Sequence, residues 1–206
     1  MAPESWAITT DAFEQAAHWF VRTAARGDGL WDSPALDLWT VRDLVGHTSR
    51  ALLTVETCLG REAAIVDVDT PEDYFRRALA AIGDPGAVAQ RGRDAGVALG
   101  PDPGDSVAEI ATRVLATVRV ASGDDLVTTP VGGMRLRDYL PTRTFELTVH
   151  TCDLAMALDE PLDVPAAAAV ASVHLLGALA ARAGQAGPLL LAATGRAPLP
   201  TGFTVL

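Results

Sequence analysis

The sequence contains no lysine: all 16 of its basic residues are arginines, and they are outnumbered by 26 aspartates and glutamates. The resulting net charge of −10 argues against nucleic acid or an anionic membrane surface as a partner, because both attract basic proteins. We therefore expect neither a nucleic-acid nor a membrane partner. The arginine-only composition fits a G+C-rich source, such as an actinobacterium.

Cysteine is scarce, and so are aromatic residues. Cys58 and Cys152 match no metal or redox spacing, which predicts two reduced core residues of a cytoplasmic protein. The first ten residues also lack the basic start and apolar run of a signal peptide. Aromatics make up 5% of the chain and hydrophobic residues 49%, so the core is built mainly from alanine, leucine and valine.

Long apolar runs are absent as well. The longest, residues 164–181, is mostly alanine and is interrupted by Pro165 and Ser172, so it predicts a buried helix rather than a membrane span. The chain has no internal repeat and no convincing domain boundary. We expect one domain, residues 1–206, in which residues 187–206 form a short C-terminal extension.

Helix-capping residues and hydrophobic periodicity predict a mainly α-helical protein. The predicted helices cover approximately residues 10–27, 40–60, 70–83, 87–99, 106–121, 141–157 and 166–183. Residues 126–136, with Gly132 and Gly133 in the middle, favour a small β-hairpin, and residues 188–206 favour a second one at the terminus.

The most informative stretch runs from Arg143 to Asp153. At 100° per residue, Glu146, His150 and Asp153 fall on one stripe of a helix. Apolar residues flank this stripe, which predicts that it faces the interior, where polar groups must be paired or liganded. The opposite face is expected to tolerate water and consists of Thr144, Thr148, Thr151 and Ala155.

A third candidate ligand, His47, lies at the edge of the apolar stripe of helix 40–60. Together with Glu146 and His150 it gives two imidazoles and one carboxylate, with a fourth position open. Catalytic zinc sites have this pattern, although it also suits ferrous iron or nickel. Asp153 would then orient an imidazole or a bound water. The pattern alone also fits a bundle with two hydrogen-bonded core histidines and no metal, which is the commoner arrangement for inward-facing histidines.

Other polar residues have simpler interpretations. Asp43 is predicted to cap helix 40–60 together with Thr40. His18 and His174 are interpreted as packing residues. Arg143 is predicted to form a salt bridge near the mouth of the bundle, with contact to an anionic substrate as the alternative.

Two stretches of the chain resemble a known family. Residues 39–47 (WTVRDLVGH) and 143–155 (RTFELTVHTCDLA) resemble the signature stretches of the mycothiol-dependent maleylpyruvate isomerase family, which belongs to the DinB-like and YfiT-like thiol transferases. The likeness continues in residues 194–203 and is loose over residues 61–125. The resemblance implies a DinB-like four-helix bundle with a long crossover connection and small β-hairpin additions. It also implies His47, Glu146 and His150 as zinc ligands, with water in the fourth position.

By this resemblance the protein is expected to be a metal-dependent, mycothiol-dependent S-transferase or cis–trans isomerase that acts on a small electrophile, with Asp153 positioning a proton. The isomerase has a further C-terminal domain that contributes to its active site, whereas about twenty residues follow the last predicted helix here. The metal and the thiol are therefore expected more firmly than maleylpyruvate as a substrate. One alternative is a non-catalytic metal- or thiol-conjugate-binding protein of the same fold. Another, a zinc-binding anti-sigma factor, is disfavoured because its His-x3-Cys-x2-Cys pattern is missing from the sequence.

Overall fold

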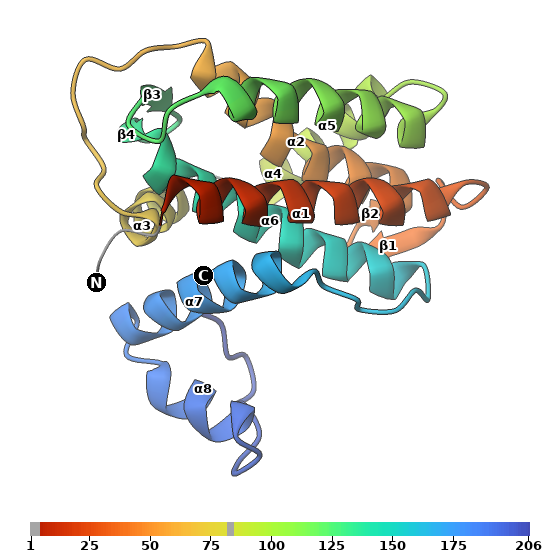
Figure 1. The fold of residues 1–206 in the computed structure, drawn as a ribbon. Coiled ribbons are helices and arrows are strands. Elements are labelled where there is room, and N and C mark those ends of the chain that lie inside the picture. Colours follow the sequence, from red (N-terminus) through yellow and green to blue (C-terminus); the bar gives the residue numbers. More distant parts are fainter. Residues whose placement is uncertain (1–4, 82–84) are drawn as a thin grey trace.

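The computed structural model describes residues 5–81 and 85–206. Within these ranges the protein is mainly helical with two small antiparallel hairpins (Figure 1). The helical fold with hairpin additions was predicted, and so was the hairpin in residues 126–135, but the hairpin in residues 34–40 was not. The helices are α1 (Trp6–Ala24), α2 (Val41–Leu59), α3 (Pro71–Ala81), α4 (Pro85–Ala98), α5 (Pro103–Val120), α6 (Leu136–Ala157), α7 (Ala166–Arg182) and α8 (Ala186–Ala193). The strands are β1 (Pro34–Leu36), β2 (Trp39–Thr40), β3 (Leu126–Thr129) and β4 (Gly132–Arg135), and a 3₁₀ turn (Ala25–Gly27) follows α1.

Helices α1, α2, α5 and α6 form the bundle. Both α1 and α2 pack against α5 and α6, so that α1 lies opposite α2 (Figure 1). The connection from α2 to α5 is the long crossover, and it contains α3 and α4. The bundle core is apolar, and its largest fully buried side chains include Phe13, Phe20, Leu44, Leu52, Met134, Tyr139, Leu147 and Leu154. The predicted four-helix architecture is therefore confirmed.

The start of α2 is fixed by its cap and by a close helix contact. Thr40 and Asp43 form the predicted capping box: the Asp43 N–H donates to Thr40 Oγ1 (3.3 Å), and the Thr40 N–H donates to Asp43 Oδ2 (3.1 Å). Three residues beyond Asp43, α2 touches α4 so closely that a Cβ atom at Gly46 would lie 2.1 Å from the Gly96 nitrogen. These two constraints set the position of His47, the next residue.

Helix α6 is longer than predicted and is buried on the face expected to meet water. It begins at Leu136, so Pro141 lies inside the helix rather than near its first turn. Thr144, Thr148 and Thr151 are at most 5% exposed, which contradicts the prediction. The reason is local: each hydroxyl donates to the carbonyl four residues earlier in its own helix, so this face needs no water and packs against neighbouring helices.

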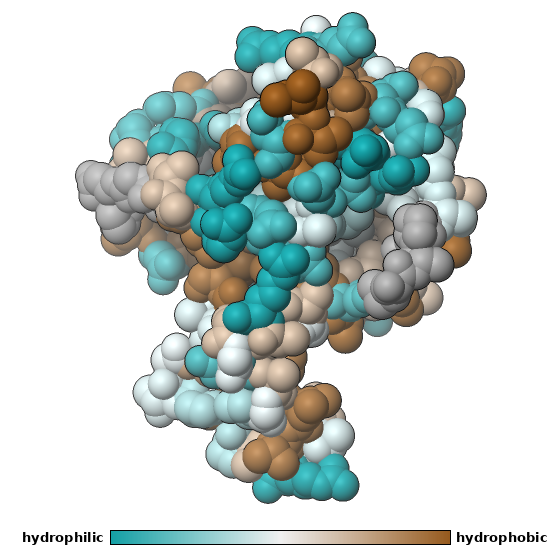
Figure 2. Space-filling view, turned by 90° about the vertical axis from the view of Figure 1, so that its left-hand side faces the viewer, coloured by the Kyte–Doolittle hydropathy of each residue, from teal (hydrophilic) through white to brown (hydrophobic). Residues whose placement is uncertain are grey.

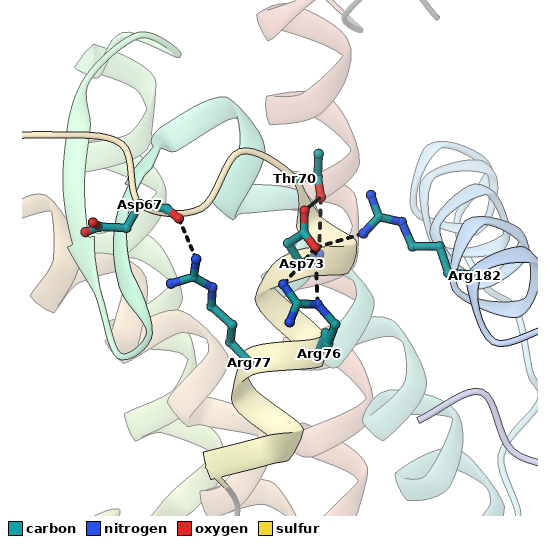
Figure 3. A network of polar contacts seen from close by, with 6 residues as sticks. All are labelled: Asp67, Thr70, Asp73, Arg76, Arg77 and Arg182. Atoms are coloured by element: carbon teal, nitrogen blue, oxygen red, sulfur yellow. Dashed lines mark hydrogen bonds and ion pairs between the residues drawn. The ribbon is translucent and has the colours of Figure 1, made fainter.

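Helix α3 is held by a polar network (Figure 3). The Asp73 carboxylate accepts hydrogen bonds from Thr70 Oγ1 (3.0 Å) at the start of α3 and from Arg182 (2.9 Å) on α7. This network is half-exposed, and exposed ion pairs contribute little stability individually, on the order of 1 kcal/mol or less. Its role is to place α3 so that Tyr74 and Phe75 are buried beside α6.

The predicted terminal hairpin is wrong. Residues 186–193 form α8 instead, and the described residues after it contain no strand. The run from Leu189 to Ala193 consists of strong helix formers, and Gly195 adopts a φ of 72° just after the helix. Helix α8 packs on α7 and projects away from the bundle (Figure 1). In Figure 2 this projection shows mostly white and brown surface, whereas hydrophilic residues gather on the bundle above it.

Two smaller predictions concern the ends of elements. Gly132 and Gly133 were expected in the middle of the β3–β4 hairpin. Its turn is Pro130–Val131 instead, and both glycines lie inside β4. Gly133 is needed there because a Cβ atom would lie 2.0 Å from the Ile65 carbonyl oxygen of the crossover. The predicted helix end at Gly83 lies outside the described residues.

Among the described helices, none is both long and apolar enough to cross a membrane.

Candidate metal centre

The three predicted ligands come together where α2 packs against α6. His47 projects from α2, and Glu146 and His150 project from consecutive turns of α6. Their ligand atoms all lie within 4.8 Å of one another, and all three residues are half-buried. The two imidazole rings are nearly perpendicular, with centroids 4.8 Å apart. The ligand stripe of α6 therefore lies at a partly open edge of the bundle rather than facing its interior.

His150 lies between two carboxylates. Its Nδ1 is 3.0 Å from Asp153 Oδ2, and its Nε2 is 3.4 Å from Glu146 Oε2. A carboxylate can only accept, so Nδ1 carries a hydrogen toward Asp153, and Nε2 is the nitrogen that faces Glu146. Burial by itself would lower the pKa of His150, but the hydrogen bonds to Asp153 and Glu146 outweigh it and raise that pKa to about 9.

His47 has the opposite electrostatic character. Burial, with the charge of His150 as the second cause, lowers its pKa to about 4, so its ring is neutral at pH 7. The ring is held by Trp39, whose centroid lies 4.5 Å away, and the Trp39 Nε1–H donates to the Ala89 carbonyl on α4 (3.0 Å). Within the described part of the chain, the buried His47 Nδ1 has no hydrogen-bond partner.

These features fit a divalent cation. A buried imidazole nitrogen without a partner is costly, and a metal ion would supply one. Two nitrogens and one oxygen with an open fourth position suit zinc. Ligands of tetrahedral zinc lie roughly 3.3 Å apart, so the widest separation of 4.8 Å requires a small inward movement of one side chain.

A cavity of about 340 Å³ opens onto the three residues. Its remaining walls include Arg50, Arg91, Arg143, Phe75, Leu79, Val88 and Leu206. This volume suits a small organic molecule. A larger cavity of about 460 Å³ lies between α1, α3, α6 and α7, but none of the predicted ligands lines it. The predicted ligands therefore line the smaller of these two cavities.

The salt bridge predicted for Arg143 is absent from the described ranges. Arg143 is only 8% exposed, and its guanidinium carbon lies 4.9 Å from the centroid of the Tyr74 ring and 5.2 Å from that of Tyr139. Its Nε–H donates to Thr142 Oγ1 (3.0 Å). The spacing of Tyr139 and Arg143 on one helix is visible in the sequence, but Tyr74 comes from α3, and only the fold brings it here.

The remaining histidines and the two cysteines lie outside the candidate ligand set. His18 and His174 are exposed and do not pack in the core, contrary to prediction, and His18 lies 3.5 Å from Glu14. Both cysteines are free, Cys58 buried and Cys152 half-buried. Burial raises the pKa of both thiols, so neither is an activated nucleophile.

Residues 13–155 match the model of one protein family, the mycothiol maleylpyruvate isomerase N-terminal domain. The chain belongs to this family. The resemblance inferred from the two signature stretches is thereby confirmed, and the match spans from α1 into α6, including His47, Glu146 and His150. No curated protein and no solved structure matches significantly. Membership of the mycothiol maleylpyruvate isomerase N-terminal domain family points to chemistry that involves a small thiol.

Proposed function

We propose that this protein is a metal-dependent enzyme that uses mycothiol to attack a small electrophile, as an S-transferase or a cis–trans isomerase. The observation that carries the proposal is the convergence of His47, Glu146 and His150 at the wall of a cavity. The family supports mycothiol as the thiol, and the ligand set supports zinc as the metal. The protein acts in the cytoplasm, where small thiols stay reduced.

The chemistry requires a thiolate. A free thiol has a pKa of about 8.5, and a divalent ion held by these three residues would supply the Lewis acidity that favours its deprotonated form. The neutral ring of His47 is ready to donate a lone pair. Asp153 accepts the Nδ1–H of His150 and so keeps Nε2 turned toward Glu146.

The walls of the cavity favour the subsequent reaction. Phe75 and Leu79 give it apolar sides that reduce the access of water to the reacting atoms. If the thiol adds to a cis double bond, rotation and elimination give the trans isomer. If the adduct is released, the outcome is S-transfer.

The metal centre is tested by metal analysis. Purified protein supplied with zinc is expected to hold about one divalent ion per chain, and His47→Ala or His150→Ala is expected to lose most of it. His174→Ala is a matched control, because His174 is exposed and does not line the cavity. Metal content equal to wild type in both ligand variants would refute the proposed centre.

Catalysis is tested with mycothiol and an electrophile such as monochlorobimane. The wild-type protein is expected to form the conjugate faster than the uncatalysed reaction, and chelator or His47→Ala is expected to abolish the acceleration. If the protein binds metal and mycothiol conjugates but accelerates no reaction across a panel of electrophiles, it is a binding protein rather than an enzyme.

A further inference from the structure

The cavity beside the candidate metal centre is unusually basic for this protein. Three arginines, Arg50, Arg91 and Arg143, line it, and Glu146 is the one acidic side chain among its described lining residues. The whole chain has a net charge of −10. Within residues 5–81 and 85–206 none of these three arginines forms an ion pair, whereas seven others do. The site therefore gathers three arginines around one acidic side chain, and none of the three is directly ion-paired in the described part of the chain.

Arg143 is the most constrained of the three. Its guanidinium is packed against the rings of Tyr74 and Tyr139, and its Nε–H is used by Thr142. A buried charge without a directly paired counter-ion is costly, so this arrangement needs an explanation. Packing against the tyrosines stabilises the cation but engages the π-system of the rings rather than the N–H groups.

The remaining N–H groups of Arg143 are free to bind a ligand. Its terminal nitrogens donate no hydrogen bond to another residue in the described part of the chain. Arg143 precedes Glu146 by three positions and His150 by seven, which places all three on one face of α6. A guanidinium presents a planar pair of donors that matches a carboxylate or phosphate. Its donors therefore serve the same cavity as the metal ligands.

We propose that Arg143 is a specificity-determining residue that binds an anionic group, a carboxylate in the first instance, on the small electrophile. Arg50, which is half-buried, and Arg91, which is exposed, attract the anion to the cavity. The identity of the bound molecule as the electrophile rests on the proposed function. The anion site itself rests on the three arginines and requires no metal.

Binding of succinate, an unreactive dicarboxylate, tests the anion site directly. Isothermal titration calorimetry measures the dissociation constant of succinate for zinc-loaded and for chelator-treated protein, and succinate is expected to bind both. Arg143→Lys keeps the charge but loses the paired donors, and it should weaken binding at least about tenfold. Arg22→Gln, an exposed arginine of α1 that does not line the cavity, should bind as wild type.

A second variant tests the anion site even if Arg143→Lys does not fold. The double variant Arg50→Gln/Arg91→Gln alters residues that are not fully buried, and it should weaken succinate binding about fivefold and reduce its salt dependence. If chelator-treated protein fails to bind succinate, or if folded Arg143→Lys or the double variant binds as tightly as wild type, the anion site is overturned.

A pair of maleimides separates this inference from the proposed function. N-ethylmaleimide and 3-maleimidopropionic acid share a reactive group, and only the second has a carboxylate. Wild type should prefer the acid about tenfold in kcat/KM, and Arg143→Lys should abolish that preference. If both reagents react at equal, accelerated rates, the proposed enzymatic function stands and the role of Arg143 is refuted. If the protein holds no metal even when zinc is supplied, yet binds succinate through Arg143, the anion site stands and the metal-dependent function is refuted.

Discussion

Raising the pH of the metal-free protein from 7 to 9 should lower its free energy of unfolding by about 2 kcal/mol through His150 alone. The hydrogen bonds to Asp153 and Glu146 overcome burial and raise the pKa of His150 from 6.5 to about 9. One unit of pKa difference between folded and unfolded states corresponds to about 1.4 kcal/mol. Because the folded-state pKa is the higher one, this stabilisation is fully present below pH 6.5 and is lost as the pH rises through 9.

The assay is urea unfolding in the presence of chelator at pH 7, 8 and 9. His150→Gln is the matched control, since it cannot titrate, and the difference between its pH profile and that of wild type isolates His150. Zinc-saturated wild type should also lack the loss, because a liganding imidazole nitrogen carries no proton. If the free energy of unfolding depends on pH in the same way for wild type and His150→Gln, Asp153 and Glu146 do not stabilise the protonated ring of His150 as described.

Further predictions concern the second carboxylate and the helix contact. Asp153→Asn should weaken zinc binding about tenfold, because it removes the charge that orients His150. Competition with a chromophoric chelator measures the zinc affinity, and an affinity equal to that of wild type would contradict this role of Asp153. Gly46→Ala should destabilise the protein by about 2 kcal/mol or more and lower its metal content, since the new Cβ meets the Gly96 backbone. Gly177→Ala, where a Cβ meets nothing within 4 Å, should instead stabilise α7 by up to about 1 kcal/mol, so equal shifts in melting temperature would contradict the packing argument.

The parts of the fold that follow from neighbouring residues were predictable. Helix α2 was expected over residues 40–60 and spans Val41–Leu59, because the capping box of Thr40 and Asp43 is a local motif. The pairing of Glu146 with His150 follows from helix geometry in the same way. That His47 would meet them depended on the family resemblance, because periodicity does not reveal which helices are neighbours.

The errors arose where a local pattern permits two outcomes. Periodicity places Thr144 and Thr148 on one face of α6, but it does not show that their hydroxyls are satisfied by their own helix and can be buried. Arg143 was expected to find a carboxylate, yet one of its two aromatic neighbours comes from α3. The leucine-rich tail suits either a strand or a helix, and α8 shows the helix.

The close contact between the rings of Trp39 and His47 gives this protein an intrinsic fluorescent probe. Indole emission depends on the charge and polarity of whatever lies against the ring, and here that neighbour is a candidate ligand. Of the four tryptophans in the sequence, Trp39 is the one that contacts a histidine ring within the described part of the chain. Occupation of the site can thus be followed by intrinsic fluorescence, with Trp39→Phe identifying the responsible emitter and no dye attached.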